Sequence, residues 1–215
     1  ASLRRLGFNS YSATMPPQPF WTHVGLVPLP RAEADPGRLS AFSGALGVPF
    51  YVDTVCWPWT LGVPGQAGSR SALPPEAFTQ GRNHWMPYRI TGKGRETWLA
   101  LWKLYAERYR DAGVRVVAYE LLNEPAYLGL SEDHRLGFEA WLQQRYEGID
   151  DLNRVWRTAF ADWHAATIFD EDERTTRIAG RYFDYDEYLS ERFTELVRDG
   201  VSLVHGILPD ALVGV

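Results

Sequence analysis

The residues best suited to chemistry in this sequence are Asn123 and Glu124, which follow a short apolar run and precede Pro125. A carboxylate at the end of a predicted strand, where proline stops the strand pairing, is well placed for acid/base work. The amide of Asn123 can donate a hydrogen bond to a ligand hydroxyl. The alternative is structural, with Glu124 capping a helix or pairing with an arginine, and a tripeptide alone does not decide between them.

Hydrolysis of a sugar linkage generally needs two carboxyl groups, one on each side of the bond that breaks. Glu120 lies on the same strand face as Glu124, but about 13 Å away at the rise of a strand. That separation is too long for the pair used by retaining enzymes. We therefore expect Glu120 to be a buried polar group paired with a neighbour. Asp53 is either a ligand to a sugar or a structural partner.

Aromatic residues are unusually frequent, at 14% of the chain with 9 tryptophans. Their rings either build a core or stack on the apolar faces of sugars. Trp57, Trp85 and Tyr127 lie in predicted loops, where each is either a sugar platform or loop packing. Four other tryptophans lie on predicted helical stripes and are expected to be core residues: Trp98, Trp102, Trp141 and Trp156.

The elements that must position these residues alternate between strands and helices. Four apolar runs predict buried strands: 6–13 (LGFNSYSA), 48–55 (VPFYVDTV), 114–122 (VRVVAYELL) and 211–215 (ALVGV). Strands that alternate with helices indicate an α/β fold with a parallel sheet. In such folds the working residues follow the carboxyl ends of the strands.

Helices are predicted from caps and periodicity. Asp35 and Pro36 open a helix that ends at Gly47, and a stripe from Trp98 to Tyr109 predicts a helix over 95–112 that Gly113 terminates. Further predicted helices begin at Ser131 and at Asp150, and the last covers 184–205. Two connections are long: a loop over 57–94 and a helical insertion over 125–183.

Composition narrows the function classes. The net charge is −5 with no basic block, which argues against a nucleic-acid partner. No apolar run is long enough to predict a membrane span. One cysteine and 5 scattered histidines give no zinc pattern, and neither a metal nor a cofactor is expected. The single cysteine and the absence of an apolar leader favour a cytoplasmic location. The oligomeric state is left open.

The segment 117–127 (VAYELLNEPAY) resembles the fourth strand of the clan A glycoside hydrolases. The stretch 138–163 (FEAWLQQRYEGIDDLNRVWRTAFADW) is similar to the region after that strand in family 42 β-galactosidases and their relatives. Asp184 and Tyr185, and then 208–210 (LPD), continue the likeness. The resemblance is strongest over 114–215. It implies a (β/α)8 barrel, of which the chain carries about strands 2 to 5.

This resemblance implies that Glu124 is the general acid/base and that Asn123 contacts the sugar 2-hydroxyl. The second carboxylate, the nucleophile, would lie on the seventh strand, outside this segment. Asn9, in the first predicted strand, is a further candidate for a substrate contact. One departure is that no arginine occurs near Ser12, where the family has one that supports the nucleophile. Another is Arg157, at a position where the family often has glycine.

The predicted function is therefore that of a retaining glycoside hydrolase acting on a β-linked carbohydrate. The alternative is a carbohydrate-binding protein on the same fold without catalysis, which the missing arginine favours. A (β/α)8 barrel takes about 250 residues, so the 215 residues are predicted to be one partial catalytic domain, 1–215. We expect this segment, expressed alone, to be insoluble or inactive, because four strands leave open sheet edges.

Overall fold

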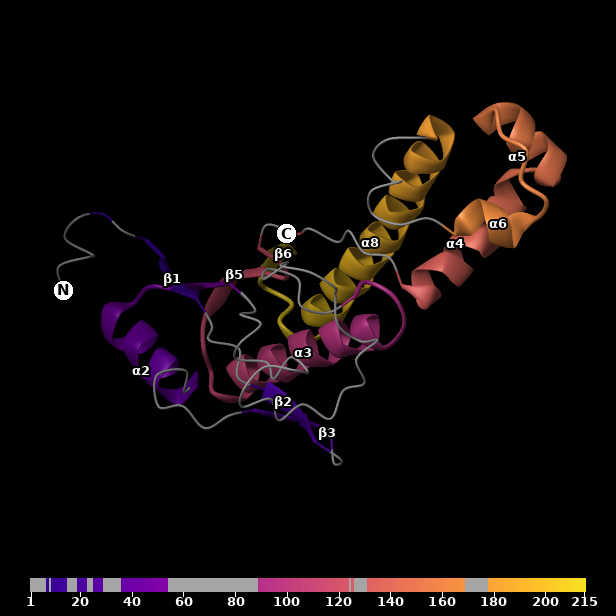
Figure 1. Ribbon diagram of the computed structural model, residues 1–215. Coiled ribbons are helices and arrows are strands. Elements are labelled where there is room, and N and C mark those ends of the chain that lie inside the picture. The colour runs from indigo at the N-terminus through magenta and orange to yellow at the C-terminus, as the bar shows by residue number, and fades with distance from the viewer. Residues whose placement is uncertain are drawn as a thin grey trace. The chain divides into compact units, whose positions relative to one another are not determined.

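A computed structural model describes residues 7, 9–14, 19–22, 25–28, 36–53, 89–123, 125, 131–168 and 178–215 (Figure 1). The chain forms two compact units. The first unit comprises 1–126 together with 196–215, and the second comprises 127–195.

A parallel four-stranded sheet forms the centre of the first unit. Its order is β1-β4-β5-β6, and every neighbouring pair is parallel. The strands are β1 (Tyr11–Thr14), β4 (Phe50–Asp53), β5 (Val116–Glu120) and β6 (Leu212–Gly214). The helices that alternate with them are α2 (Pro36–Leu46), α3 (Gly92–Asp111) and α8 (Ala179–Ile207). The predicted α/β class and parallel sheet are confirmed.

The first strand lies later in the chain than predicted. Pairing with β4 covers Tyr11 to Thr14, whereas the predicted strand was 6–13. Gly7 has a φ of 86°, a left-handed conformation that a strand does not adopt. Asn9 and Ser10 are exposed residues that precede the strand. The apolar run therefore overstates the strand at its amino end.

A small antiparallel hairpin was not predicted. It pairs β2 (Pro19–Thr22) with β3 (Gly25–Pro28). Each strand has only four residues and carries a proline at its outer end. Because proline weakens a strand pattern, the sequence carried no clear strand signal here.

One face of the main sheet is deeply buried. Phe50 and Val52 of β4 and Tyr119 of β5 are at most 1% exposed. The predicted stripe of α3 is also buried as expected, namely Trp98, Leu101, Trp102, Tyr105 and Tyr109. Helix α3 ends as predicted, just before Gly113, which has a left-handed conformation with φ 68°.

Several helix boundaries differ from the predicted ones. Helix α3 begins at Gly92 rather than at 95, so the loop predicted over 57–94 is shorter at its end. Helix α8 begins at Ala179 rather than at 184, inside the predicted insertion. The last residues before it, 169–177, lie outside the described residues. Thr91 precedes α3 without making a side-chain cap hydrogen bond, and Ile178, which precedes α8, has no side chain that could cap a helix.

The helices of the second unit are α4 (Glu132–Arg145), α5 (Ile149–Trp156), α6 (Trp163–Thr167) and the start of α8. Ser131 caps α4 as predicted, because its side chain accepts a hydrogen bond from the His134 N–H at 3.2 Å. Asp150 was wrongly predicted as the cap of α5, whose cap is Gly148. Helix α6 was not predicted, although Asp162 caps it by accepting from the Ala165 N–H at 2.8 Å.

An aromatic cluster forms the core of this second unit. The ring of Phe138 on α4 lies 5.0 Å from Tyr185 and 5.6 Å from Tyr188, centroid to centroid. It lies 6.5 Å from Trp156 of α5. Trp156 is buried as predicted, and Phe138 is fully buried, whereas Leu136 of the same helix as Phe138 is 52% exposed. These aromatic contacts join α4, α5 and α8.

The described residues contain neither a candidate membrane span nor a candidate metal site. None of their helices is both long and apolar enough to cross a membrane. No group of three or more His, Cys, Asp or Glu in the described part of the chain is arranged to hold a metal ion.

Candidate functional site

Two acidic residues lie on neighbouring strands at the carboxyl edge of the parallel sheet. Asp53 ends β4 and Glu120 ends β5, and the two residues are direct partners in the strand register. Partners on neighbouring strands project from the same face. Thr14 of β1 and Gly214 of β6 occupy the same row. This edge is where α/β folds place their working residues.

Glu120 is hydrogen-bonded to a residue of the neighbouring strand, as expected. The hydroxyl of Tyr51 on β4 donates a hydrogen bond to Glu120 Oε2. Burial raises the pKa of Tyr51 well above its usual value, and the hydrogen bond to Glu120 and the Asp53 charge raise it further. Tyr51 therefore stays neutral and keeps its proton as a donor. The predicted pairing of Glu120 is confirmed, whereas its side chain is half-buried rather than buried.

The segment after β5 is tied to its surroundings on two sides. The Leu121 N–H donates to the Gly214 carbonyl of β6 at 2.8 Å, which extends the ladder by one residue. The Leu121 carbonyl accepts from the Trp102 indole Nε1–H of α3 at 2.9 Å. Leu121 and Leu122 are buried, and Asn123 is half-buried. The chain thus reaches Asn123 from a firmly held strand end.

The predicted site residues fall in three places. Asn123 lies just beyond the carboxyl end of β5, as expected of a working residue. Asn9 lies before β1, at the amino end of its strand, where the Ser10 hydroxyl donates to its Oδ1 at 3.5 Å. The remaining predicted residues lie outside the described residues: Glu124, Trp57, Trp85 and Tyr127.

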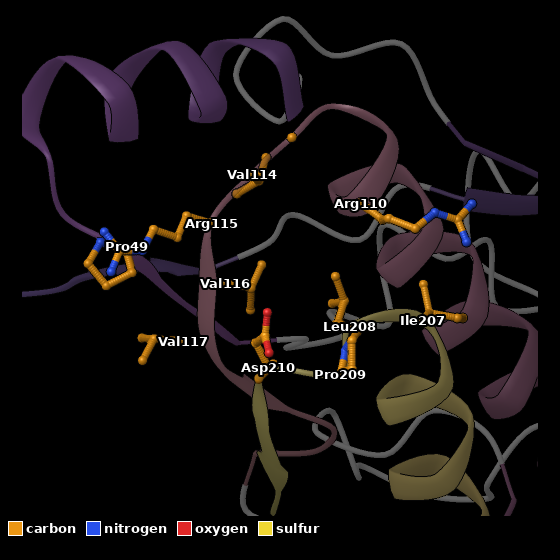
Figure 2. A pocket seen from close by; sticks show the side chains of 12 residues that line it. Pro49, Arg110, Val114, Arg115, Val116, Val117, Ile207, Leu208, Pro209 and Asp210 are labelled. Carbon is orange, nitrogen blue, oxygen red and sulfur yellow. The ribbon is translucent and has the colours of Figure 1, made fainter.

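A hollow of about 530 Å³ opens at the opposite, amino edge of the sheet (Figure 2). Its wall is formed by the residues that lead into β5 and β6, among them Val114, Val116, Leu208 and Pro209. Neither Asn9 nor Asn123, the predicted site residues that the structure describes, lines it. Because the working residues of parallel α/β folds follow the strands, this hollow is not the candidate active site.

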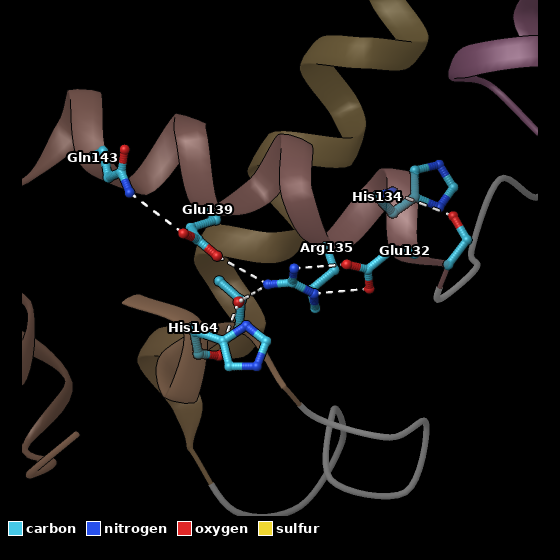
Figure 3. Close-up of polar contacts among 8 residues, drawn as sticks. Glu132, His134, Arg135, Glu139, Gln143 and His164 are labelled. Atoms are coloured by element: carbon cyan, nitrogen blue, oxygen red, sulfur yellow. Dashed lines mark hydrogen bonds and ion pairs between the residues drawn. The ribbon is translucent and has the colours of Figure 1, made fainter. Parts of the chain in front are cut away.

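A second hollow, of about 370 Å³, lies in the second unit around Arg135 of α4, whose polar contacts are drawn in Figure 3. Arg135 donates to both carboxylate oxygens of Glu132, at 2.7 and 2.9 Å, and to Glu139 at 2.9 Å. It also donates to the Thr167 hydroxyl of α6 at 3.2 Å. The hydrogen bonds to Glu132 and Glu139 raise the pKa of Arg135, which remains charged. This network connects α4 with α6.

Asp184 of α8 binds polar groups from two other helical segments, α5 and the carboxyl end of α4. Its Oδ2 accepts from the Tyr146 hydroxyl at 2.5 Å and from the Trp156 indole Nε1–H at 2.9 Å. The Arg145 Nε lies 3.7 Å from Oδ1. Burial, followed by the Asp184 hydrogen bond and charge, raises the pKa of Tyr146 to about 12. The phenol therefore serves as a neutral donor to the carboxylate.

The residues that carried the family resemblance thus converge in space. Arg145, Tyr146, Trp156 and Asp184 lie in one cluster although up to 39 positions separate them in the sequence. The family model of glycoside hydrolase family 42, β-galactosidase, matches residues 78–214. The chain belongs to this family.

Other comparisons agree with this family 42 assignment. The chain is 30% identical over 138 residues to β-galactosidase BbgII of Bifidobacterium bifidum, which covers 60% of the chain and 19% of that relative. Its fold is similar to that of a catalytic mutant of Gan42B, a family 42 β-galactosidase from G. stearothermophilus. That likeness has a TM-score of 0.71 at 16% identity and covers 98% of the chain and 31% of the other.

The β-galactosidase from the psychrophilic Marinomonas ef1 is also similar, with a TM-score of 0.66 at 15% identity over 98% of the chain and 33% of that chain. These likenesses show the fold, which is part of a (β/α)8 barrel. The family 42 chain spans about a fifth of the curated relative and about a third of each solved chain.

The departure at Arg157 has a structural explanation in this family 42 chain. Arg157 ends α5 with φ 58° and ψ 50°, and it is the described non-glycine residue with a positive φ. A side chain in this left-handed conformation is strained, and glycine is the usual residue there.

We expect Arg157→Gly to raise the free energy of unfolding by about 1 kcal/mol, because glycine adopts the left-handed conformation without strain. Urea unfolding followed by circular dichroism measures it. The matched control is Arg154→Gly inside α5, which should lower stability by about 1 kcal/mol, as glycine does within a helix. Equal destabilisation by both variants would contradict the explanation.

Proposed function

We propose that the protein hydrolyses β-linked galactosides with retention of the anomeric configuration. In this proposal Glu124 is the general acid/base, Asn123 contacts the sugar 2-hydroxyl, and the nucleophile lies outside residues 1–215. The observation that carries it is the placement of Asn123 at the carboxyl edge of a parallel sheet in a family 42 chain. The residue that follows Asn123 in the sequence is the carboxylate Glu124, and barrel enzymes act at this edge of the sheet.

The chemistry divides between the two carboxyl groups. The protonated Glu124 would donate its proton to the leaving-group oxygen while the nucleophile attacks the anomeric carbon. After departure of the aglycone, the ionised Glu124 would deprotonate the water that releases the sugar. Such a pair requires carboxyl groups about 5 to 5.5 Å apart. Glu120 is engaged by Tyr51 and supports the strand rather than the reaction in this proposal.

The remaining predicted contacts keep the same roles in this proposal. Trp57, Tyr127 and Trp85 would present rings to the apolar faces of the sugar. Asn9 has weaker support than these, because it lies at the amino end of β1. No cofactor or metal takes part in the proposed steps.

A second function is favoured by one observation in β1. No arginine occurs between Arg5 and Arg31, a stretch that includes all of β1. Without the arginine that supports the nucleophile, the protein would bind carbohydrate without cleaving it.

Incubating the full-length protein with aryl β-galactosides, and following the anomeric protons by NMR, separates the two functions. The proposal expects release of the aryl group with the β-anomer of galactose formed first. Formation of the α-anomer first would contradict retention. Calorimetric binding of galactosides without hydrolysis over long incubation would favour the binding protein instead.

A further inference from the structure

The indole of Trp102 is joined to the strand that leads to Asn123. Its Nε1–H donates to the Leu121 carbonyl at 2.9 Å, three positions before Glu124. In return the Tyr119 hydroxyl of β5 donates to the Trp102 carbonyl at 3.5 Å. Trp102 is fully buried and Leu121 is too, so the hydrogen bond is formed away from water. A buried carbonyl that loses its donor is expensive, which makes this contact a strong restraint.

Gly200 of α8 lies close to both residues of this contact. A Cβ atom at Gly200 would lie 2.6 Å from Cζ3 of Trp102 and 3.0 Å from Cδ1 of Leu121. Both distances are shorter than ordinary van der Waals contact, so no side chain fits there without displacing the ring or the leucine. The Trp98 ring stacks on this indole with centroids 5.7 Å apart, but the hydrogen bond to Leu121, and not this stacking, fixes the direction of the indole N–H. The indole therefore has little freedom to turn away from Leu121.

We propose that Trp102 is a positioning residue for the acid/base, and that Gly200 holds its indole in place. The hydrogen bond to Leu121 anchors the residues that lead into Asn123, and a proton donor is effective only within hydrogen-bond reach of the leaving oxygen. A shift of about 1 Å in that donor lowers catalysis strongly. The inference rests on the proposed function of Glu124, and it assigns to α3 and α8 a role in the reaction.

The test compares Trp102→Phe with Trp98→Phe in the full-length protein. Each variant replaces a fully buried indole by a smaller ring, and only the Trp102 indole donates to Leu121. Values of kcat/KM are measured for 2,4-dinitrophenyl and phenyl β-galactoside. The phenyl leaving group needs protonation by the acid, whereas the dinitrophenyl group leaves without it.

For Trp102→Phe we expect kcat/KM for the phenyl substrate to fall about 10-fold more than for the dinitrophenyl substrate. For Trp98→Phe the two values should fall together, because lost packing reduces the active fraction without moving the acid selectively. Equal loss on both substrates for Trp102→Phe would overturn the positioning role.

Gly200→Ala provides a second variant, which displaces the indole but retains its N–H. Its kcat/KM should also fall more for the phenyl than for the dinitrophenyl substrate. If Trp102→Phe does not fold, this variant tests the positioning role in its place. An unchanged ratio in folded Gly200→Ala would overturn the role of Gly200. Glu124→Ala separates this inference from the proposed function. If Glu124→Ala loses activity and both positioning variants leave the ratio unchanged, only the positioning role fails.

Discussion

Replacing Glu124 by alanine in the full-length protein should lower kcat/KM for phenyl β-galactoside about 10²- to 10⁴-fold, the usual contribution of a general acid. The dinitrophenyl substrate should lose much less in kcat/KM, because its leaving group departs without protonation. Added azide should restore turnover on that substrate and yield β-galactosyl azide, since azide needs no general base to attack the glycosyl-enzyme intermediate. Stopped assays with product analysis by NMR measure both effects.

The matched control is Glu147→Ala, which removes an exposed glutamate of the second unit. Its kcat/KM should equal that of the unaltered protein on both substrates. Undiminished hydrolysis by Glu124→Ala would rule out the acid/base assignment. A large loss on both substrates without azide rescue would favour a role for Glu124 in binding or folding instead.

Replacing Asp184 by alanine should lower the free energy of unfolding of the helical unit by about 3 kcal/mol. Asp184 is 7% exposed, and its carboxylate receives the Tyr146 hydroxyl and the Trp156 indole N–H. The variant leaves two donors of the interior without their acceptor and Arg145 without one of its carboxylates. Urea unfolding followed by tryptophan fluorescence measures the loss, because Trp156 reports on this cluster directly.

Asp186→Ala is the control for this cluster, because Asp186 lies on the same helix but is exposed. Its stability should change by at most about 0.5 kcal/mol, as for other surface substitutions. Asp184→Asn should fall between the two, since the amide keeps one acceptor oxygen but loses the charge. An Asp184→Ala variant as stable as Asp186→Ala would show that the cluster contributes little to the fold.

Much of the fold could be predicted because its signals are local. The stripe from Trp98 to Tyr109 repeats every three or four residues, which predicts both the helix and its buried face. Gly113 marks the end of that helix through its conformational freedom. The strand of residues 114–122 is apolar and short, and it is observed as β5. Each of these signals is contained within one element.

The errors arose where the local signal was weak or shared between alternatives. The run 6–13 is apolar enough for a strand, but pairing with β4 starts only at Tyr11. Asp150 and Gly148 both precede a helical pattern, and the chain begins the helix at the glycine. Where a strand or helix begins, and which of its sides is buried, depends on the elements that pack against it.

The sequence by itself determined the alternation of strands and helices, the buried stripe of α3, and the position of Asn123 after a strand. These follow from periodicity, caps and residue chemistry over short stretches. Only the tertiary structure decided that Asp53 lies beside Glu120, that Asp184 receives Tyr146 and Trp156, and that Trp102 holds Leu121. Such contacts join residues from different elements, so they depend on strand order and helix packing, which no local pattern encodes.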